Sequence, residues 1–275
     1  MFAKDIGKLS ESAENKLRYM DRSPLGYILL SALAGIYLGF GITLIFAVGG
    51  PIAEAGGAAY LRLIMGACFG VALSLVIFAG AELFTGNNMV FAIGRLNNGL
   101  AYRQIGILFA LCFLGNLIGS VFLAWLVVLG GSLPASSEQL IMKVAAVKMH
   151  LTPKQAFLRG VLCNWLVCLA VWVANRSQSE SARLIMIFWC LFAFVGSGFE
   201  HSIANQSLLS LALFLPHGAD ITISGFIHNQ VFVTLGNLVG GGMMVGMFYA
   251  FIHSDAQPEK KRQEEVVCAS KEPAE

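Results

Sequence analysis

His201 stands where a long apolar segment is interrupted by the string Gly196-Ser197-Gly198-Phe199-Glu200-His201. If that segment crosses a membrane, the imidazole lies near mid-depth, where ionisable groups are costly and are functional candidates. Imidazole titrates near neutral pH, so it can give a proton to a weak-acid anion or take one back. The alternative is that backbone carbonyls hold the ring and that it only shapes the loop. Glu200 either pairs with His201 or, as we favour, ties the broken backbone together.

Lys148 and Asn164 are the other polar side chains whose positions suggest chemistry. Lys148 lies in the short segment between the third and fourth apolar runs, where its charge would draw anions toward a pore mouth. The ordinary reading of such a lysine is a snorkelling surface residue. Asn164 stands alone in a strongly apolar run. It donates a hydrogen bond either to a substrate or to a neighbouring helix.

Large apolar residues border both interruptions of the apolar pattern. Leu83 and Phe84 flank the first, and Phe194 precedes the second. Rings of such side chains can exclude hydrated ions by dewetting, although most Leu and Phe in an apolar protein face lipid. Ser197 and His201 also have the spacing of a serine–histidine hydrolase pair. No third orienting group and no nucleophile-elbow motif accompany them, so a membrane-embedded enzyme is the weaker hypothesis.

The composition indicates an integral membrane protein. Of 275 residues, 57% are hydrophobic and 12% are charged, whereas a soluble domain carries about 25% charged residues. The net charge of +2 gives no reason to expect a nucleic-acid partner. The cysteines are scattered through apolar runs without a Cys-x-x-Cys pair, which favours small buried side chains over disulfides or metal ligands. No cofactor is expected.

Six apolar segments are long enough to cross a bilayer, which needs about 20 residues for a helix. They cover residues 26–48, 61–83, 104–130, 155–173, 182–215 and 230–252. The second is followed by the polar string Thr85-Gly86-Asn87-Asn88, which we expect to be non-helical, and the fifth is interrupted at Gly196–His201. The sequence therefore predicts an N-terminal segment at 1–22, a six-helix channel domain at 23–253 and a disordered tail at 254–275. Residues 3–20 have the pattern of an amphipathic surface helix.

The basic residues predict that both termini are cytoplasmic. Most of them then fall in the inner segments, as the positive-inside rule requires. The remaining basic residues fall outside, and most of these flank the junction of the third and fourth spans: Arg62, Lys143, Lys148, Lys154 and Arg159. The cluster at this junction lies on the disfavoured side of the membrane, so we expect it to have a role there. We call all of the basic residues on the outer side of the membrane the outer group.

Spans one to three look duplicated as spans four to six. The string Gly115–Ser120 in span three resembles Gly236–Gly241 in span six. Glu82 is followed by Asn87 as Glu200 is followed by Asn205, at nearly the same offset. Three spans are an odd number, so the second copy is inverted. Inverted repeats with a broken helix in each half are typical of transporters and channels, with the pathway at the breaks. The glycines themselves favour close helix packing.

The breaks are therefore the predicted pore. Non-helical backbone at membrane depth survives only where it is buried in protein or faces a water-filled cavity. The ends of the half-helices also present N–H groups with partial positive charge, which suits an anion. Glu82, Glu200 and Asn205 are expected to hold the loop structure at these breaks.

Several strings of this chain resemble the formate/nitrite transporter family. They are Ala81–Asn87, Phe199–Asn205, Cys163–Trp172 and Ser23–Gly26, in the family's order, and the resemblance covers roughly residues 23–253. It implies an all-α, aquaporin-like fold of six spans in a 3+3 inverted repeat, with helices two and five broken. It also implies a homopentamer with one pore in each protomer, in the bacterial cytoplasmic membrane.

The resemblance also implies roles for particular residues. His201 becomes the central pore histidine, Lys148 the vestibule lysine and Asn164 its partner in span four. The inner constriction and mobile loop comprise Leu83, Phe84 and Thr85, and further constriction positions are Phe69, Leu73 and Phe194. The strings Phe84-Thr85-Gly86 and Cys163-Asn164-Trp165 look more like the nitrite branch of the family than the formate branch. A hydrosulfide branch shares the same histidine.

We therefore expect a channel for a small monovalent anion, nitrite first, with formate or hydrosulfide as alternatives. A charge that enters a dry apolar constriction unpaired costs many kcal/mol, roughly tens by continuum estimates, and a neutral acid costs far less. In one hypothesis the anion accepts a proton at or near His201 and crosses as the neutral acid. In the other an imidazolium binds the charged anion at low pH. A proton-coupled symporter fits the same residues.

Overall fold

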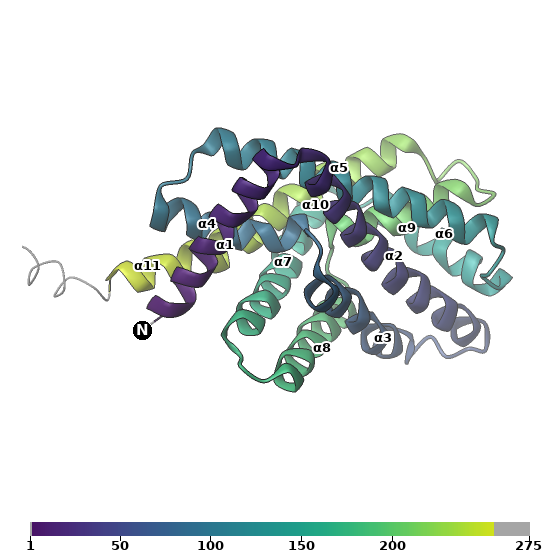
Figure 1. Ribbon diagram of the computed structural model, residues 1–275. Coiled ribbons are helices and arrows are strands. Elements are labelled where there is room, and N and C mark those ends of the chain that lie inside the picture. The colour runs from purple at the N-terminus through teal and green to yellow at the C-terminus, as the bar shows by residue number, and fades with distance from the viewer. Residues whose placement is uncertain (1, 256–275) are drawn as a thin grey trace, which may run out of the picture.

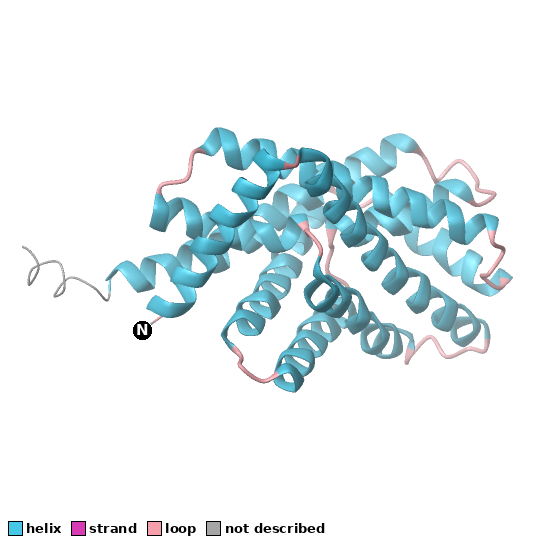
Figure 2. Ribbon diagram, in the orientation of Figure 1, coloured by secondary structure: helices cyan, strands magenta, loops and turns pink. Residues whose placement is uncertain are grey.

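The computed structural model describes residues 2–255, and all of its regular structure is helical (Figure 2). The tail predicted at 254–275 lies almost wholly outside the described residues. Six helical segments are long and apolar enough to cross a membrane. The helices, in chain order, are α1 (Ala3–Arg22), α2 (Pro24–Glu54), α3 (Leu61–Leu75), η1 (Val76–Gly80), α4 (Phe84–Asn98), α5 (Tyr102–Leu129), α6 (Ala135–Met149), α7 (Pro153–Arg176), α8 (Glu180–Ser197), α9 (Ser202–Phe214), α10 (Ile223–Leu238), η2 (Val239–Met247) and α11 (Phe248–Asp255).

The inverted repeat is visible in how the helices pack. In one half α2 packs along α5, and in the other half α7 packs along α10. The two halves meet through α3 and α8, which cross each other, and through the pairs α4 with η2 and α9 with α5. Each broken span thus lends its second half-helix to the opposite copy of the repeat (Figure 1). This arrangement confirms the predicted all-α fold with helices two and five broken.

Both breaks are shorter than predicted. Span two runs through α3 and a π-helical turn, η1, and loses helical geometry only at residues 81–83. The polar string Thr85-Gly86-Asn87-Asn88 is therefore not a loop but the first turn of α4, so that expectation was wrong. In span five the break covers residues 198–201. Gly80 and Gly198 end the first half-helices with φ of 81° and 71°, a conformation that glycine adopts without a steric penalty.

Two further helices, α1 and α6, lie at opposite ends of the molecule (Figure 1). The amphipathic helix expected at residues 3–20 forms as α1, and its apolar side is buried against the protein through Ile6, Leu9, Ala13 and Leu17. It packs on α4 and α2. The α6 helix, which was not predicted, packs on α2 and α9. Each of these helices precedes the first span of one repeat, so they are counterparts.

The glycines of the repeated strings hold the paired spans together. A Cβ on Gly119 would lie 1.9 Å from the carbonyl oxygen of Ala32. A Cβ on Gly240 would lie 2.2 Å from that of Val161. Backbones this close leave no room for a side chain, which is the purpose of small residues at membrane helix interfaces. The packing interpretation of these glycines is confirmed.

Candidate functional site

His201 is buried at the centre of the molecule, where it is the N-cap residue of α9. Its side chain is 3% exposed. Its Nδ1 accepts a hydrogen bond from the backbone N–H of Ala204 at 3.1 Å. Its Nε2 lies 3.0 Å from Oγ1 of Thr85, in the first turn of α4. The contact therefore joins the two broken spans, and it brings together two residues that the sequence predicted as pore residues.

The tautomer of His201 follows from these two contacts. Because Nδ1 accepts from Ala204, the proton of the neutral ring is on Nε2 and is donated to the Thr85 hydroxyl oxygen. The Thr85 hydroxyl hydrogen is then available to another acceptor. Protonation of the ring would require Nδ1 to give up the Ala204 N–H, which caps the α9 helix. The imidazole is thus arranged as a neutral hydrogen-bond donor.

Aromatic rings close the space beside the imidazole. The ring of Phe194 stacks on His201 with centroids 5.9 Å apart, and Phe69 meets Phe194 edge-to-face at 5.7 Å. Leu73 and Leu83 are buried and line the cavity on the α1 side. Of these four predicted constriction residues, Phe194 contacts the histidine directly and Phe69 packs on Phe194. Leu73 and Leu83 line the cavity that approaches the first break.

Phe84 is placed differently from the other predicted constriction residues. Its ring packs edge-to-face on Phe109 and Phe113 of α5, at centroid distances of 5.4 and 5.3 Å. Its contacts are therefore those of a helix-packing residue. The predicted role of Phe84 in the constriction is supported only by its position next to Leu83 in the chain.

Asn164 is fully buried in α7, where its amide nitrogen holds backbone. The amide donates to the carbonyl oxygen of Thr85 at 3.1 Å and to that of Asn237 at 2.7 Å. The Cys168 thiol also donates to the Thr85 carbonyl, at 3.3 Å. The sequence left open whether Asn164 donates to a substrate or to a neighbouring helix. In the structure its amide donates to the backbone of two neighbouring helices, α4 and α10.

On the α6 side of His201, Lys148 forms an ion pair with Glu200. The Lys148 Nζ lies 2.8 Å from each carboxylate oxygen. Asn205 donates to the same carboxylate at 2.7 Å and also to Asn229 at 2.9 Å. Glu200 does not pair with His201. We expected its carboxylate to accept hydrogen bonds from backbone N–H groups, but its partners are the side chains of Lys148 and Asn205.

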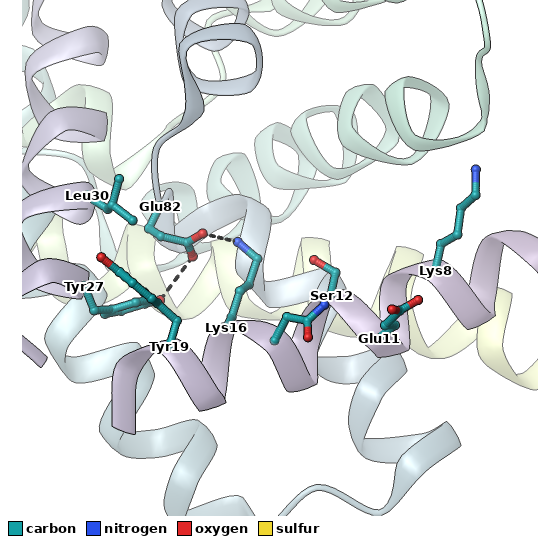
Figure 3. Close-up of a pocket in the computed structure, with 9 residues that line it drawn as sticks. Lys8, Glu11, Ser12, Lys16, Tyr19, Tyr27, Leu30 and Glu82 are labelled. Carbon is teal, nitrogen blue, oxygen red and sulfur yellow. Dashed lines mark hydrogen bonds and ion pairs between the residues drawn. The ribbon is translucent and has the colours of Figure 1, made fainter. Parts of the chain in front are cut away.

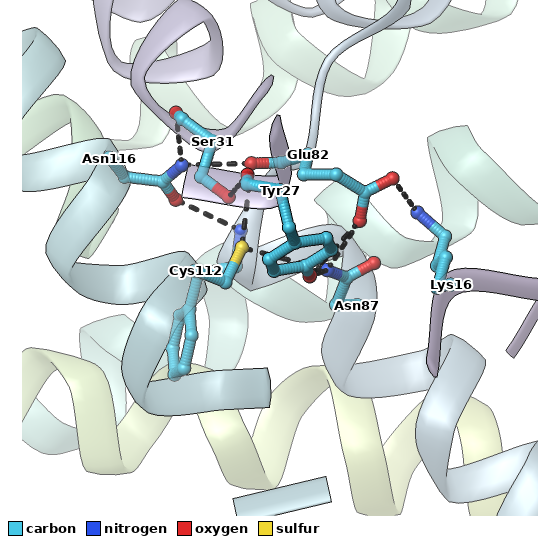
Figure 4. A network of polar contacts seen from close by, with 8 residues as sticks. Lys16, Tyr27, Ser31, Glu82, Asn87, Cys112 and Asn116 are labelled. Carbon is cyan, nitrogen blue, oxygen red and sulfur yellow. Dashed lines mark hydrogen bonds and ion pairs between the residues drawn. The ribbon is translucent and has the colours of Figure 1, made fainter. Parts of the chain in front are cut away.

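The α1 side carries a matching network around Glu82 (Figure 4). Its carboxylate pairs with Lys16 of α1 and accepts from the hydroxyl of Tyr27 at 3.2 Å and from Asn87 at 3.1 Å. Lys16, Glu82 and Asn87 thus correspond to Lys148, Glu200 and Asn205. Sequence reasoning missed Lys16 because α1 contains several lysines and nothing in its spacing distinguishes this one.

A vestibule opens beside Glu82, with α1 as one wall (Figure 3). It comprises a cavity of about 620 Å³ lined by Lys16, Tyr27, Leu30 and Glu82. A second cavity of about 500 Å³ continues from Lys16 and Glu82 to Leu73, Leu83 and Gly86. These cavities therefore extend to the first break, where Leu73 and Leu83 line the second of them. We call the two cavities the α1 vestibule, and we use the name α6 vestibule for the region around Lys148 and Glu200, which the inverted repeat places in the corresponding position.

Asn116 fixes the first break. Its amide donates to the carbonyl oxygens of Ser31 at 2.7 Å and Glu82 at 2.8 Å, and its carbonyl oxygen accepts the N–H of Phe84 at 3.0 Å. One buried side chain thereby satisfies the backbone on both sides of the interruption. The N–H of Phe84 is consequently not free to bind an anion, contrary to our expectation for this half-helix end.

Asn237 fixes the second break in the same way. Its amide donates to Gly160 at 2.8 Å and to the carbonyl of Glu200 at 3.0 Å, and its oxygen accepts the N–H of Ser202 at 2.8 Å. Asn116 and Asn237 are the asparagines of the two repeated strings. The repetition was visible in the sequence, but only the structure shows that these side chains clamp the breaks.

The chain matches the formate/nitrite transporter family over residues 4–251. It is 42% identical over 250 residues to the nitrite transporter NirC of Escherichia coli (strain K12), which covers 90% of this chain and 91% of that protein. The similarity therefore extends over nearly the whole of both chains.

Two solved structures are similar to this fold. An FNT family ion channel superimposes with a TM-score of 0.86 at 40% identity, covering 91% of this chain and 99% of that one. A pentameric formate channel with formate bound superimposes with a TM-score of 0.74 at 29% identity, covering 84% of this chain and 98% of that one.

Proposed function

The chain belongs to the formate/nitrite transporter family, and from this premise we propose that it conducts a small monovalent anion, nitrite first, across a membrane. Its six spans make it a multi-pass membrane protein. The greater identity to a nitrite transporter than to the formate channel favours nitrite. Formate is the second candidate because that channel, which has formate bound, shares the fold over nearly its whole length.

The observation that carries this proposal is the hydrogen bond between His201 and Thr85, flanked by two Lys–Glu–Asn networks. In the proposed path one network lies at each mouth. The His201–Thr85 pair lies between the two networks, behind apolar side chains. Unpaired basic residues near a pore mouth raise the local concentration of an anion. The constriction then excludes the hydrated charge. A charged mouth followed by an apolar constriction suits an anion that can cross as its neutral acid.

In the proposed passage the anion reaches the constriction and accepts a proton there, because the neutral acid crosses an apolar ring at much lower cost. The proton comes from solvent, and the Thr85 hydroxyl donates a hydrogen bond to the passing substrate while His201 Nε2–H holds the hydroxyl in place. Delivery of the proton by His201 itself requires that Nδ1 first release the Ala204 N–H. Binding of the charged anion by an imidazolium carries the same requirement.

We further propose that the protein is a homopentamer with one pore in each protomer, in the bacterial cytoplasmic membrane, with both termini cytoplasmic. The pentameric formate channel supports the assembly, and the distribution of basic residues supports the orientation. With that orientation the α1 vestibule faces the cytoplasm and the α6 vestibule faces outward.

The hydrolase hypothesis has no support from the geometry of its two residues. Both ring nitrogens of His201 have partners other than Ser197, namely Ala204 and Thr85. The relatives of this chain are transporters and channels. We therefore propose that the protein is a channel and not an enzyme.

The test is anion uptake into proteoliposomes by the wild type and by His201→Asn, with nitrite, formate and hydrosulfide, at about pH 5 and about pH 7.5. Asparagine is a good N-cap residue, so the Ala204 N–H keeps a partner while the titratable ring is lost. We expect the wild type to carry nitrite in a pH-dependent manner and the variant to lose at least about tenfold of the flux.

The pentamer content of the variant, measured by size exclusion, is the control for folding. Equal fluxes of all three anions would leave a channel without nitrite preference. Normal uptake by His201→Asn would remove the imidazole from the mechanism.

A further inference from the structure

The outer group of basic residues predicted from the sequence is only partly explained by the proposed function. Lys148 is one member, and its charge is opposed by Glu200, whose side chain is 3% exposed. The pair as a whole is neutral. The positive potential that an anion meets in the α6 vestibule must therefore come from other members of the group.

Arg159 lies beside Glu200 at the second break, in the position that corresponds to a wall residue of the α1 vestibule. Its carbonyl oxygen accepts the N–H of Glu200 at 3.2 Å, as that of Leu30 accepts the N–H of Glu82 at 3.2 Å. Leu30 lines the α1 vestibule beside Glu82 (Figure 3). Arg159 is the counterpart of Leu30 and is half-buried. Among residues 2–255 its guanidinium has no hydrogen-bond acceptor and no acidic partner.

Arg62 approaches the same break from α3. Its guanidinium carbon lies 3.8 Å from the position that a Cβ would occupy on Gly198, at the start of the loop that leads to Glu200 and His201. The side chain is exposed, and no acceptor within the described part of the chain binds it. By contrast Arg183, in the first turn of α8, donates twice to the carbonyl of Ser177, at 2.9 and 2.7 Å.

The two vestibules therefore differ in charge although their backbones correspond. The α1 vestibule is lined by two charges of each sign, from Lys8, Glu11, Lys16 and Glu82, with Leu30 beside the ion pair. The α6 vestibule has one ion pair, with two guanidinium groups without partners near the same break. A guanidinium presents a planar fork of N–H groups that matches two oxygens of one anion. Nitrite and formate both offer two oxygens in one plane, and hydrosulfide offers none.

We infer that Arg62 and Arg159 form an anion-capture site at the α6 vestibule, selective for planar two-oxygen anions. This inference rests on the proposed function and adds an asymmetry to it. The site loads the channel from the α6 side at lower anion concentration than from the α1 side. It acts before the constriction, so it affects half-saturation and selectivity rather than the maximal rate.

The first test measures nitrite conductance from each side of a planar bilayer for the wild type, Arg159→Leu and Arg62→Gln. Leucine is the residue found at the counterpart position, so it fits the backbone of the repeat. We expect the half-saturating nitrite concentration to rise about tenfold on one side only, with unchanged maximal conductance. The hydrosulfide value should move less than the nitrite value, and high salt should shrink the effect.

One lysine substitution and one control variant separate charge from shape. Arg159→Lys keeps the charge without the fork, so it should restore hydrosulfide but not nitrite half-saturation. Lys154→Gln removes an exposed charge from the beginning of α7 and should have little effect. The inference is overturned if Arg159→Leu and Arg62→Gln change nitrite half-saturation no more than Lys154→Gln does.

A second readout does not depend on conduction. Phenylglyoxal modifies accessible arginines, and its rate at each residue can be followed by mass spectrometry on protein in nanodiscs. Nitrite and formate should slow the modification of Arg62 and Arg159 but not of Arg103, which is exposed at the start of α5. If nitrite protects Arg62 and Arg159 in a protein that conducts no anion, the proposed function is wrong and the anion-capture site stands. If the protein conducts nitrite and neither arginine is protected, the anion-capture site is wrong and the proposed function stands.

Discussion

At the scale of single residues, the centre of the proposed pathway consists of one hydroxyl and one imidazole. The Thr85 hydroxyl receives the Nε2–H of His201, so its own hydrogen is available to a substrate in the proposed constriction. The Thr85 carbonyl is held separately by Asn164 and Cys168. The backbone of Thr85 is thus fixed by α7 while its side chain is fixed by α9. Because of this double support, we expect Thr85 to matter as much for passage as the histidine.

Thr85→Val should therefore reduce nitrite flux by roughly ten- to a hundredfold, the range expected for loss of one hydrogen bond to a charged or strongly polar partner. Valine keeps the shape of threonine but leaves the His201 Nε2–H without an acceptor. Thr85→Ser restores the hydroxyl and should retain most of the flux. The measurement is proteoliposome uptake normalised to the amount of folded protein. Equal flux in the valine and serine variants would show that the hydroxyl takes no part.

Some residues of the candidate site could be predicted from the sequence and others could not. His201 and Glu200 are rare polar groups within an apolar run, and rarity made them visible. Lys148 was visible from its place between the third and fourth spans. Lys16 is one lysine of a polar helix, and its pairing with Glu82 depends on how α1 folds back over the vestibule. Such a contact between segments far apart in the chain has no local sequence signal.

At the scale of helices, each break is a short interruption held by an asparagine from the last span of its own repeat. Asn116 and Asn237 satisfy backbone on both sides of the gap, and the glycines around them let the helices approach closely enough for this. The breaks are consequently rigid, buried features that set the positions of Thr85 and His201.

Close packing at the repeated strings gives a direct test of this support. In Gly240→Ala the new Cβ would meet the Val161 carbonyl of α7 at 2.2 Å. We expect a loss of about 1–3 kcal/mol of stability from this overpacking, seen as a lower melting temperature in detergent. In Gly196→Ala the new Cβ meets nothing within 4 Å, so that variant should be unchanged or slightly more stable. Equal melting temperatures for the two variants would contradict the packing argument.

The long helices could be predicted because lipid demands long apolar runs. The limits of the breaks could not be. Thr85, Asn87 and Asn88 look like a polar loop, but they continue as helix because Asn116 caps Phe84 and Glu82 binds Asn87. The α6 helix was missed because it is too short to span a membrane. The π-helical stretch η2 contains the glycine run 240–242, which the sequence pattern predicts only as a close-packing face.

At the scale of the whole molecule, one chain supplies every group of the pathway described above. The two vestibules, both ion pairs, the aromatic rings and the His201–Thr85 contact all lie within residues 2–255 of a single chain. The inverted repeat builds them in pairs, and the pairs meet at the histidine. An assembly of several chains would therefore contain several complete pathways.

Mixed assemblies of wild-type and His201→Asn chains test this conclusion. If every subunit conducts on its own, nitrite flux per assembly should fall in proportion to the fraction of variant chains. If the pathway lay between subunits, one variant chain would impair the whole assembly, and the flux would fall far more steeply. The two chains can be co-expressed at known ratios, with the composition of the purified assemblies checked by native mass spectrometry. A steep decline at low variant fractions would contradict a pore within each chain, and would move the conducting path to the subunit boundary.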